Sequence, residues 1–249
     1  MKWVLTNSVT KLFFLILLSI QILSGINLKN NHTIHSSTKK SLSNNFSNRI
    51  INLTYYLDNR AFNTFNVLTA SKLPFGLNIF GFIDLHSSQN QIKDRFDLTR
   101  YFIEYRLRYT IDGNHMFGIK NLGIDLEYND FTGTNNHLFR LGITNKQFIY
   151  LFGNKSWMQI RYFPFESDKS GDQISFSFLL KLSSNIFING FIDYNINKKK
   201  QNKIVTEPQL NIRLNEYLII NIEYRYNGYE EKNPDLIGSG IALGLRLDL

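Results

Sequence analysis

Charged and uncharged residues alternate along segment after segment of this chain. Between Tyr101 and Tyr109 every second residue is Tyr, Ile or Leu, and the positions between them carry Glu104, Arg106 and Arg108. Successive side chains of a β-strand point to opposite faces, so such a segment predicts a strand with one apolar and one charged face. A soluble sandwich turns its charged face to water, whereas a barrel in a membrane turns its apolar face outward and its charges inward.

Period-two patterning recurs in twelve segments, and no amphipathic helix of convincing length interrupts them. The segments lie near 50–57, 63–72, 76–86, 97–111, 118–130, 137–146, 157–165, 172–182, 186–197, 203–214, 216–227 and 236–249. Connections after even-numbered segments are short, such as 73–75 and 183–185, and those after odd-numbered segments are longer and polar. An even strand number with short turns at one end is typical of bacterial outer-membrane barrels. The link 147–156 is the expected exception, because it is long and apolar.

The apolar face of these segments is almost free of charge. In eleven of them, leaving out the poorly patterned 63–72, about fifty positions predicted to face lipid carry no charged residue. A charge near the bilayer midplane of a barrel costs about 2–4 kcal/mol, which accounts for its absence. Tyrosines lie at or near strand ends on this face, where an interfacial girdle belongs. They are Tyr55, Tyr101, Tyr109, Tyr128, Tyr162, Tyr194 and Tyr226.

The amino-terminal segment indicates that the protein is exported from the cytoplasm. A positively charged start precedes an apolar run over 12–23, and the small residues Ser24 and Gly25 follow. This order predicts a secretory signal peptide over residues 1–25, with an uncleaved signal anchor as the alternative. The signal peptide, the tyrosines and the apolar Leu249 favour a membrane barrel over a periplasmic or secreted sandwich. An apolar last strand position also suits recognition by the barrel-assembly machinery.

Composition predicts one domain after the signal. Residues 26–49 are rich in Asn, Ser and Lys without periodicity and are expected to form a disordered leader before a barrel over 50–249. The chain has no Cys, which excludes disulfides and a lipoprotein anchor. A net charge of +8 suits nucleic acid, but the clearest basic run, within 198–203, lies between two strand patterns like a solvated loop. We expect lipid and solute partners, not nucleic acid.

The inward face is predicted to carry equal numbers of opposite charges. The acids are Asp84, Glu104, Asp125, Glu127, Asp193, Glu207, Glu223 and Asp248, and the bases are Arg106, Arg108, Arg140, Arg161, Lys181, Arg213, Arg225 and Arg246. Opposite charges on neighbouring strands can pair in a confined lumen. A balanced lumen favours a small neutral or zwitterionic solute over phosphate or a selected cation. The alternative is that these side chains simply fill a closed barrel.

Several stretches resemble the Tsx-like nucleoside-specific outer-membrane channel superfamily, especially its branch of small barrels. They are Phe80-Gly81-Phe82-Ile83-Asp84, Gly123-Ile124-Asp125-Leu126-Glu127-Tyr128-Asn129, Phe191-Ile192-Asp193-Tyr194 and Thr206-Glu207-Pro208-Gln209. The resemblance covers most of the chain from about Ile50 to Leu249. It implies a monomeric twelve-stranded barrel with a narrow nucleoside channel. Pro208 has no amide hydrogen and predicts a bulge or a strand start.

We therefore predict a lumen that binds solute in the outer membrane of a Gram-negative-type cell. The candidate residues are Phe80, Phe82, Asp84, Glu104, Arg106, Asp125, Glu127, Phe191, Asp193, Glu207 and Arg225. The acids can accept hydrogen bonds from sugar hydroxyls, and Phe82 and Phe191 can stack on a flat base.

Catalysis is the competing class of function. A barrel-type lipid hydrolase needs a serine, a histidine and an orienting group within reach of one another. The only local pairing is His86 with Ser87 and Ser88, and adjacent strand residues point apart. No metal-ligand spacing or phosphate-binding glycine loop occurs. We predict no enzyme, cofactor or metal, and keep a non-conducting structural or adhesive barrel as the nearer alternative.

Overall fold

The computed structural model describes most of the carboxy-terminal four-fifths of the chain. The described residues are 49–89, 98, 100–111, 121–132, 137–169, 171–198, 201–228 and 238–249. The predicted signal peptide and all of the predicted leader except Arg49 lie outside these ranges, as do the expected strand residues 118–120 and 236–237. Within the described ranges, no helix is long and apolar enough to cross a membrane.

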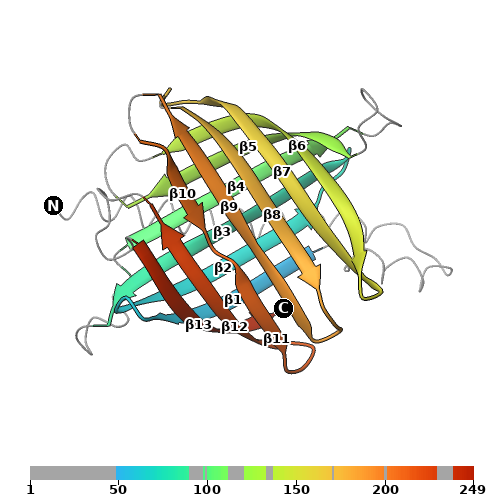
Figure 1. The fold of residues 1–249 in the computed structure, drawn as a ribbon, viewed down its shortest axis with the longest axis vertical. Helices are drawn as coiled ribbons and strands as arrows, with labels where there is room; N and C mark the ends of the chain where they lie inside the picture. Colours follow the sequence, from blue (N-terminus) through green and yellow to red (C-terminus); the bar gives the residue numbers. More distant parts are fainter. Residues whose placement is uncertain are drawn as a thin grey trace, which may run out of the picture. The chain divides into compact units, whose positions relative to one another are not determined.

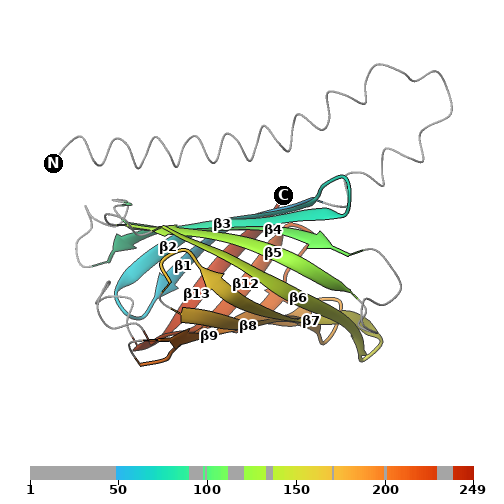
Figure 2. The ribbon, with the colours of Figure 1, turned by 90° about the horizontal axis from the view of Figure 1, so that it is seen from above.

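In the described ranges, thirteen β-strands form one closed antiparallel sheet (Figures 1 and 2). Their bounds are β1 Arg49–Asp58, β2 Phe62–Lys72, β3 Leu77–Ser88, β4 Arg100–Thr110, β5 Leu122–Phe131, β6 Leu138–Leu151, β7 Asn154–Glu166, β8 Gly171–Lys181, β9 Ile186–Asn197, β10 Lys203–Thr206, β11 Gln209–Arg213, β12 Leu218–Asn227 and β13 Gly238–Asp248. Pairing of β13 with β1 closes the barrel. β10 and β11 share one place between β9 and β12, so the barrel has twelve strand positions, as predicted.

The break between β10 and β11 falls at Glu207 and Pro208. Proline cannot donate to a strand ladder, so the pairing is interrupted locally. The Glu207 amide donates to the Phe191 carbonyl at 3.2 Å, and the Pro208 carbonyl accepts from Tyr224 N at 3.0 Å. Gly190 on β9 permits this close approach, since a Cβ there would lie 2.5 Å from the Glu207 carbonyl oxygen. The irregularity that Pro208 predicts is therefore an interruption within one barrel strand.

The segment 147–156 is part of a hairpin, and the prediction of a long link there is wrong. β6 continues to Leu151 and β7 begins at Asn154. Only Phe152 and Gly153 connect them, with φ angles of 49° and 76°. The apolar run therefore supplies strand residues that pair across β6 and β7. We refer to the barrel end that carries this turn as the short-turn end, and to the opposite end as the loop end.

Short connections gather at the short-turn end, together with the first residue of β1 and the last of β13. The turns 73–76, 182–185 and 214–217 lie there with the β6–β7 turn. The connection 111–121 between β4 and β5 is the exception, because it is long and also belongs to this end. At the loop end, however, the connections 59–61 and 167–170 are as short as these turns, so the predicted asymmetry of turns and loops holds only in part.

The outward face is mainly apolar along the described strands, with β2 as the exception, because Asn63, Thr69 and Ser71 face outward there. Outward positions carry charge only near strand ends, at Arg49, Asp130 and Asp172. Of the seven predicted girdle tyrosines, Tyr109 lies at the short-turn end. The other six lie in the half of their strands nearer the loop end. Such a surface matches the apolar interior and the interfacial zone of a bilayer.

Candidate functional site in the lumen

Paired polar side chains line the inside of the barrel. Ten of the eleven candidate residues lie at inward positions of their strands, and the eleventh, Glu207, lies at the break between β10 and β11. Asp125 and Glu127 are 0% exposed, and Arg106 and Arg225 are 7% and 6% exposed. Charged groups this deeply buried require partners, because an isolated buried charge is costly. The structure supplies those partners in two networks.

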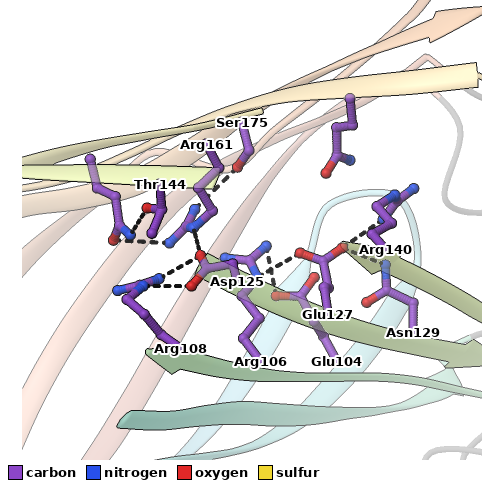
Figure 3. A network of polar contacts seen from close by, with 12 residues as sticks. Glu104, Arg106, Arg108, Asp125, Glu127, Asn129, Arg140, Thr144, Arg161 and Ser175 are labelled. Carbon is purple, nitrogen blue, oxygen red and sulfur yellow. Dashed lines mark hydrogen bonds and ion pairs between the residues drawn. The ribbon is translucent and has the colours of Figure 1, made fainter. Parts of the chain in front are cut away.

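Glu127 on β5 is the centre of the first network (Figure 3). Arg106 Nε donates to its Oε2 at 2.7 Å, and Arg140 Nη1 donates to its Oε1 at 2.6 Å. Asn129 Nδ2 adds a third hydrogen bond at 3.0 Å. Arg106 also pairs with Glu104 at 2.8 Å. These charge-assisted bonds fix the guanidinium groups against the wall formed by β4, β5 and β6.

Asp125 is a second acceptor in the same network (Figure 3). Arg108 donates to both of its oxygens, at 2.6 and 2.9 Å, and Arg161 Nε donates at 3.1 Å. Arg161 continues the network to Ser175 on β8 at 3.2 Å and to Gln159 at 3.1 Å. One carboxylate thus holds two arginines from β4 and β7. These arginines belong to the wall and do not stand free in the lumen.

Arg225 on β12 is the centre of the second network. Its Nε donates to Glu223, and its Nη1 donates to Thr64 at 2.9 Å and lies 3.6 Å from Asp58. Its guanidinium carbon lies 4.7 Å from the centre of the Tyr56 ring. The second network joins β12 to β1 and β2 across the closure of the barrel.

Three of the predicted acids stand apart from these ion pairs. Asp84 accepts a hydrogen bond from Asn66 at 2.8 Å. In the part of the chain that the structure describes, neither Asp84 nor Glu207 forms an ion pair, and Asp193 Oδ1 has no hydrogen-bond partner. Asp84 and Glu207 are partly exposed and can accept hydrogen bonds from a solute, whereas Asp193 Oδ1 is buried.

Two stretches of identical sequence carry these acids. Residues 81–84 and 190–193 both read Gly-Phe-Ile-Asp. The first lies on β3 and the second on β9, which are six strand positions apart in either direction around the barrel. Phe82 and Phe191, both partly exposed, therefore occupy opposite walls of the lumen. Both stretches are among those that resemble the Tsx-like superfamily. Their position on opposite walls depends on strand order and was not predicted.

The likeness extends across the neighbouring strands. One row of cross-strand neighbours is Phe80, Arg106, Glu127, Arg140 and Glu166, and the corresponding row is Asn189, Gln209, Glu223, Ala242 and Asp58. Both rows have Glu in the third place and an acid in the fifth. The lumen thus consists of two similar halves, β3–β8 and β9–β13 with β1–β2, related by a pseudo-twofold axis along the barrel.

Glycines in equivalent places support this symmetry. A Cβ at Gly142 on β6 would lie 2.7 Å from the Phe163 ring, and one at Gly244 on β13 would lie 2.6 Å from the Tyr56 ring. Phe163 is 0% and Tyr56 4% exposed. In each half, therefore, a glycine makes room for an aromatic ring that fills the lumen wall.

The prediction of equal charge numbers in the lumen is wrong. Further inward residues are Asp58, Glu166, Lys72, Arg100, Lys146, Lys155 and Lys203. At the short-turn end, the inward residues Lys72, Lys146, Lys155 and Lys181 gather. In the described ranges, four inward lysines therefore cluster at the short-turn mouth of the barrel.

His86 does not form a hydrolytic pair with its neighbouring serines. Its Nδ1 lies 3.0 Å from the Thr64 hydroxyl, which also accepts from Arg225. Thr64 is 0% exposed and His86 6% exposed, so both belong to the buried wall. Among the described residues, no group of three or more His, Cys, Asp or Glu side chains is arranged to hold a metal ion.

Comparison with known proteins identifies the fold. No protein-family model matches the sequence, and no curated protein matches it. Among solved structures, the chain is similar to KdgM porin, alone and in complex with disordered oligogalacturonate, with TM-score 0.50 and 10% identity over 80% of this chain and 99% of that chain. It is similar to NanC porin with TM-score 0.51 and 7% identity over 80% and 98%. The barrel has a porin fold. The nucleoside specificity implied by the Tsx-like resemblance stays a prediction.

Proposed function

We propose that this chain is an outer-membrane channel for small neutral solutes, with nucleosides as the leading candidate. The apolar outward face and the porin fold support placement in the outer membrane of a Gram-negative-type cell. The sheet closes on itself through β13 and β1, which leaves no strand edge for pairing with a second copy, and the proposal includes a monomer. The proposal includes membrane lipids and the barrel-assembly machinery as partners.

The observation that carries the proposal is the pair of Phe–Asp units on opposite walls. Phe82 and Phe191 each stand two residues before an acid on the same inward face. An aromatic ring can stack on a base at about 1–3 kcal/mol, whatever the base. Asp84 and Asp193 then accept hydrogen bonds from the sugar hydroxyls.

An aromatic column lengthens the first of these walls. The Phe80 and Phe82 ring centres lie 6.2 Å apart, and those of Phe82 and Phe102 lie 5.7 Å apart. All three rings are partly exposed. Successive stacking positions of similar strength allow a solute to move along the wall without being trapped. Tight networks around Glu127 and Asp125 hold the surrounding wall in place.

Solute flux tests the proposal. Liposomes that contain the protein should swell faster with nucleosides than with a sugar phosphate of comparable size. Phe82→Ala combined with Phe191→Ala should lower nucleoside flux by about fivefold or more, because two stacking surfaces are lost. Phe176→Ala, an outward-facing residue on β8, is the matched control and should leave flux unchanged. Equal entry of the sugar phosphate, or unchanged nucleoside flux in the double variant, would contradict the proposal.

A non-conducting structural barrel is the second candidate. It is favoured by the complete burial of inward side chains such as Asp125, Glu127 and Phe163. Single-channel recording in a planar bilayer separates the two functions. Conductance that a nucleoside blocks supports the channel, and absence of conductance supports the filled barrel.

A further inference from the structure

The β6–β7 hairpin extends beyond its neighbour at the short-turn end. β5 pairs with β6 only as far as Asn145. The next inward positions are Lys146 and Phe148 on β6, with Trp157 and Lys155 on β7. Figures 1 and 2 show the hairpin at this end of the barrel. We call these four residues the Lys146–Lys155 cluster.

Two ammonium groups flank aromatic rings in this cluster. Lys146 Nζ lies 4.1 Å from the centre of the Trp157 ring and 5.5 Å from that of Phe148. Lys155 Nζ lies 4.4 Å from the centre of the Phe148 ring. Cation–π contacts position the two ammonium groups, but they leave the N–H donors available.

Positive charge in the cluster is not neutralised by the described residues. Neither Lys146 nor Lys155 forms an ion pair in the ranges that the structure describes. The positive charges of Arg108 and Arg161, and then of Lys72 and Lys155, act repulsively on the Lys146 ammonium. Asp125, the neighbouring acid on β5, is already held by two arginines. Like charges gathered in this way favour a bound anion, which would offset their repulsion.

The place in the other half that corresponds to Lys146 holds an acid. Lys146 pairs with Gln159, and the residue at the equivalent place in the other half is Asp248, which pairs with Asn52. Asp248 forms ion pairs with Arg246 at 2.6 Å and Arg213 at 3.2 Å. Asp248 therefore neutralises two arginines at its side of the mouth, and no described acid does so for Lys146 and Lys155 beside the extended hairpin.

We propose that the Lys146–Lys155 cluster binds an oxyanion group, phosphate or carboxylate, of a small solute entering the short-turn mouth of the lumen. The lysines donate to the anion, and the rings of Phe148 and Trp157 pack against the rest of the solute. Their inward positions favour a solute in the mouth over a lipid headgroup outside the barrel. The site is separate from the Phe82 and Phe191 walls and does not require that the barrel conduct.

Trp157 reports directly on this site. The chain has two tryptophans, and Trp3→Phe leaves Trp157 as the only one. In maltoside micelles, which contain no phosphate, iodide should quench Trp157 more strongly than neutral acrylamide does, and inorganic phosphate should protect against iodide in a saturable manner. Lys146→Gln with Lys155→Gln should lower the iodide quenching constant about threefold or more and leave acrylamide quenching unchanged, because two attracting charges are removed.

Two controls distinguish anion binding at this cluster from a general effect of the protein's charge and from binding of a lipid headgroup. Lys198→Gln, an exposed lysine at the loop end, should leave iodide quenching unchanged. Equal iodide quenching in the double lysine variant, or no protection by phosphate, would overturn the proposal. So would loss of phosphate protection in phosphatidylglycerol vesicles but not in phosphatidylcholine vesicles, since a lipid headgroup would then occupy the cluster. If the protein does not transport nucleosides, the fluorescence test of the Lys146–Lys155 cluster still applies.

Discussion

Gly142 and Gly244 show how a missing side chain determines what the lumen wall can hold. Each faces an aromatic ring that fills the barrel wall. Their surroundings differ, however, in what a Cβ would meet first. At Gly142 the nearest atom is the Tyr162 backbone oxygen at 2.2 Å, whereas at Gly244 the nearest atoms belong to the Tyr56 ring at 2.6 Å. A backbone atom cannot move aside as a ring can.

Alanine substitutions at these glycines should therefore behave differently. We expect Gly142→Ala and Gly244→Ala each to destabilise the barrel by about 1–3 kcal/mol through overpacking. Tyr56→Leu should restore part of the stability lost in Gly244→Ala, and Phe163→Leu should not rescue Gly142→Ala. Urea unfolding in micelles measures all four variants. Equal rescue of both glycine variants would contradict this interpretation.

Substitutions of two neighbouring residues on β4 should differ in their cost to stability, because the two side chains face different environments. Leu107 faces outward and is 37% exposed, and Arg108 faces inward and pairs with Asp125. Leu107→Arg should lower the free energy of unfolding in lipid vesicles by about 2–4 kcal/mol. Arg108→Ala should cost less, because Arg161 still pairs with Asp125. Similar losses from both variants would show that the face assignment of β4 is incorrect.

At the scale of elements, the alternation of apolar and charged residues predicted two features well, the number of strand positions and the outward and inward faces. It predicted less well the residues at which the strands end. The outward and inward sets on β4 and β13 follow directly from alternate apolar residues. The failure at 147–156 has a physical cause: Lys146, Phe148 and Trp157 lie past the end of β5, where apolar and charged residues share one face. The alternation of apolar and charged residues weakens where a hairpin extends past the end of its neighbouring strand.

The interruption between β10 and β11 gives a prediction at this scale. A Cβ at Gly190 would lie 2.5 Å from the Glu207 oxygen and 2.6 Å from the Pro208 Cα. Gly190→Ala should therefore destabilise the barrel by about 1–3 kcal/mol, because only backbone atoms could move to relieve the contact. Pro208→Ala should change stability by less than about 1 kcal/mol, since the break also depends on Gly190. Thermal unfolding compares them, and a larger loss from Pro208→Ala would contradict this account.

At the scale of the whole molecule, the sequence predicted a twelve-position barrel and the side of the wall on which each candidate residue lies. It did not predict which residues meet. The opposition of Phe82 and Phe191 requires closure of β13 on β1, and the positive mouth requires the hairpin extension. Both are consequences of strand order and register, which a single strand pattern does not contain. The solute-binding role of the candidate residues stays a prediction.

The pseudo-twofold axis leads to a prediction about the whole barrel. It relates the junction between β13 and β1, where the native barrel strands begin and end, to the β6–β7 turn at Phe152 and Gly153. The Leu249 amide donates to the Ile51 carbonyl at 2.9 Å, so a short Gly/Ser linker can join Leu249 to Arg49. A permuted barrel that starts at Gly153 and ends at Phe152 should therefore retain all twelve strand positions and their pairings.

We expect this permutant to give sheet-rich circular dichroism and the same heat-modifiable migration on gels as the unpermuted barrel. Circular permutation is tolerated where few backbone hydrogen bonds are broken, and the two-residue turn meets that condition. A permutant opened between Leu126 and Glu127 is the control. It should fail to fold, because it cuts β5 at the carboxylate that holds Arg106 and Arg140. If both permutants fold equally well, the contacts of Glu127 with Arg106 and Arg140 are not needed for closure of the barrel. If neither folds, the β6–β7 turn is not equivalent to the junction between β13 and β1.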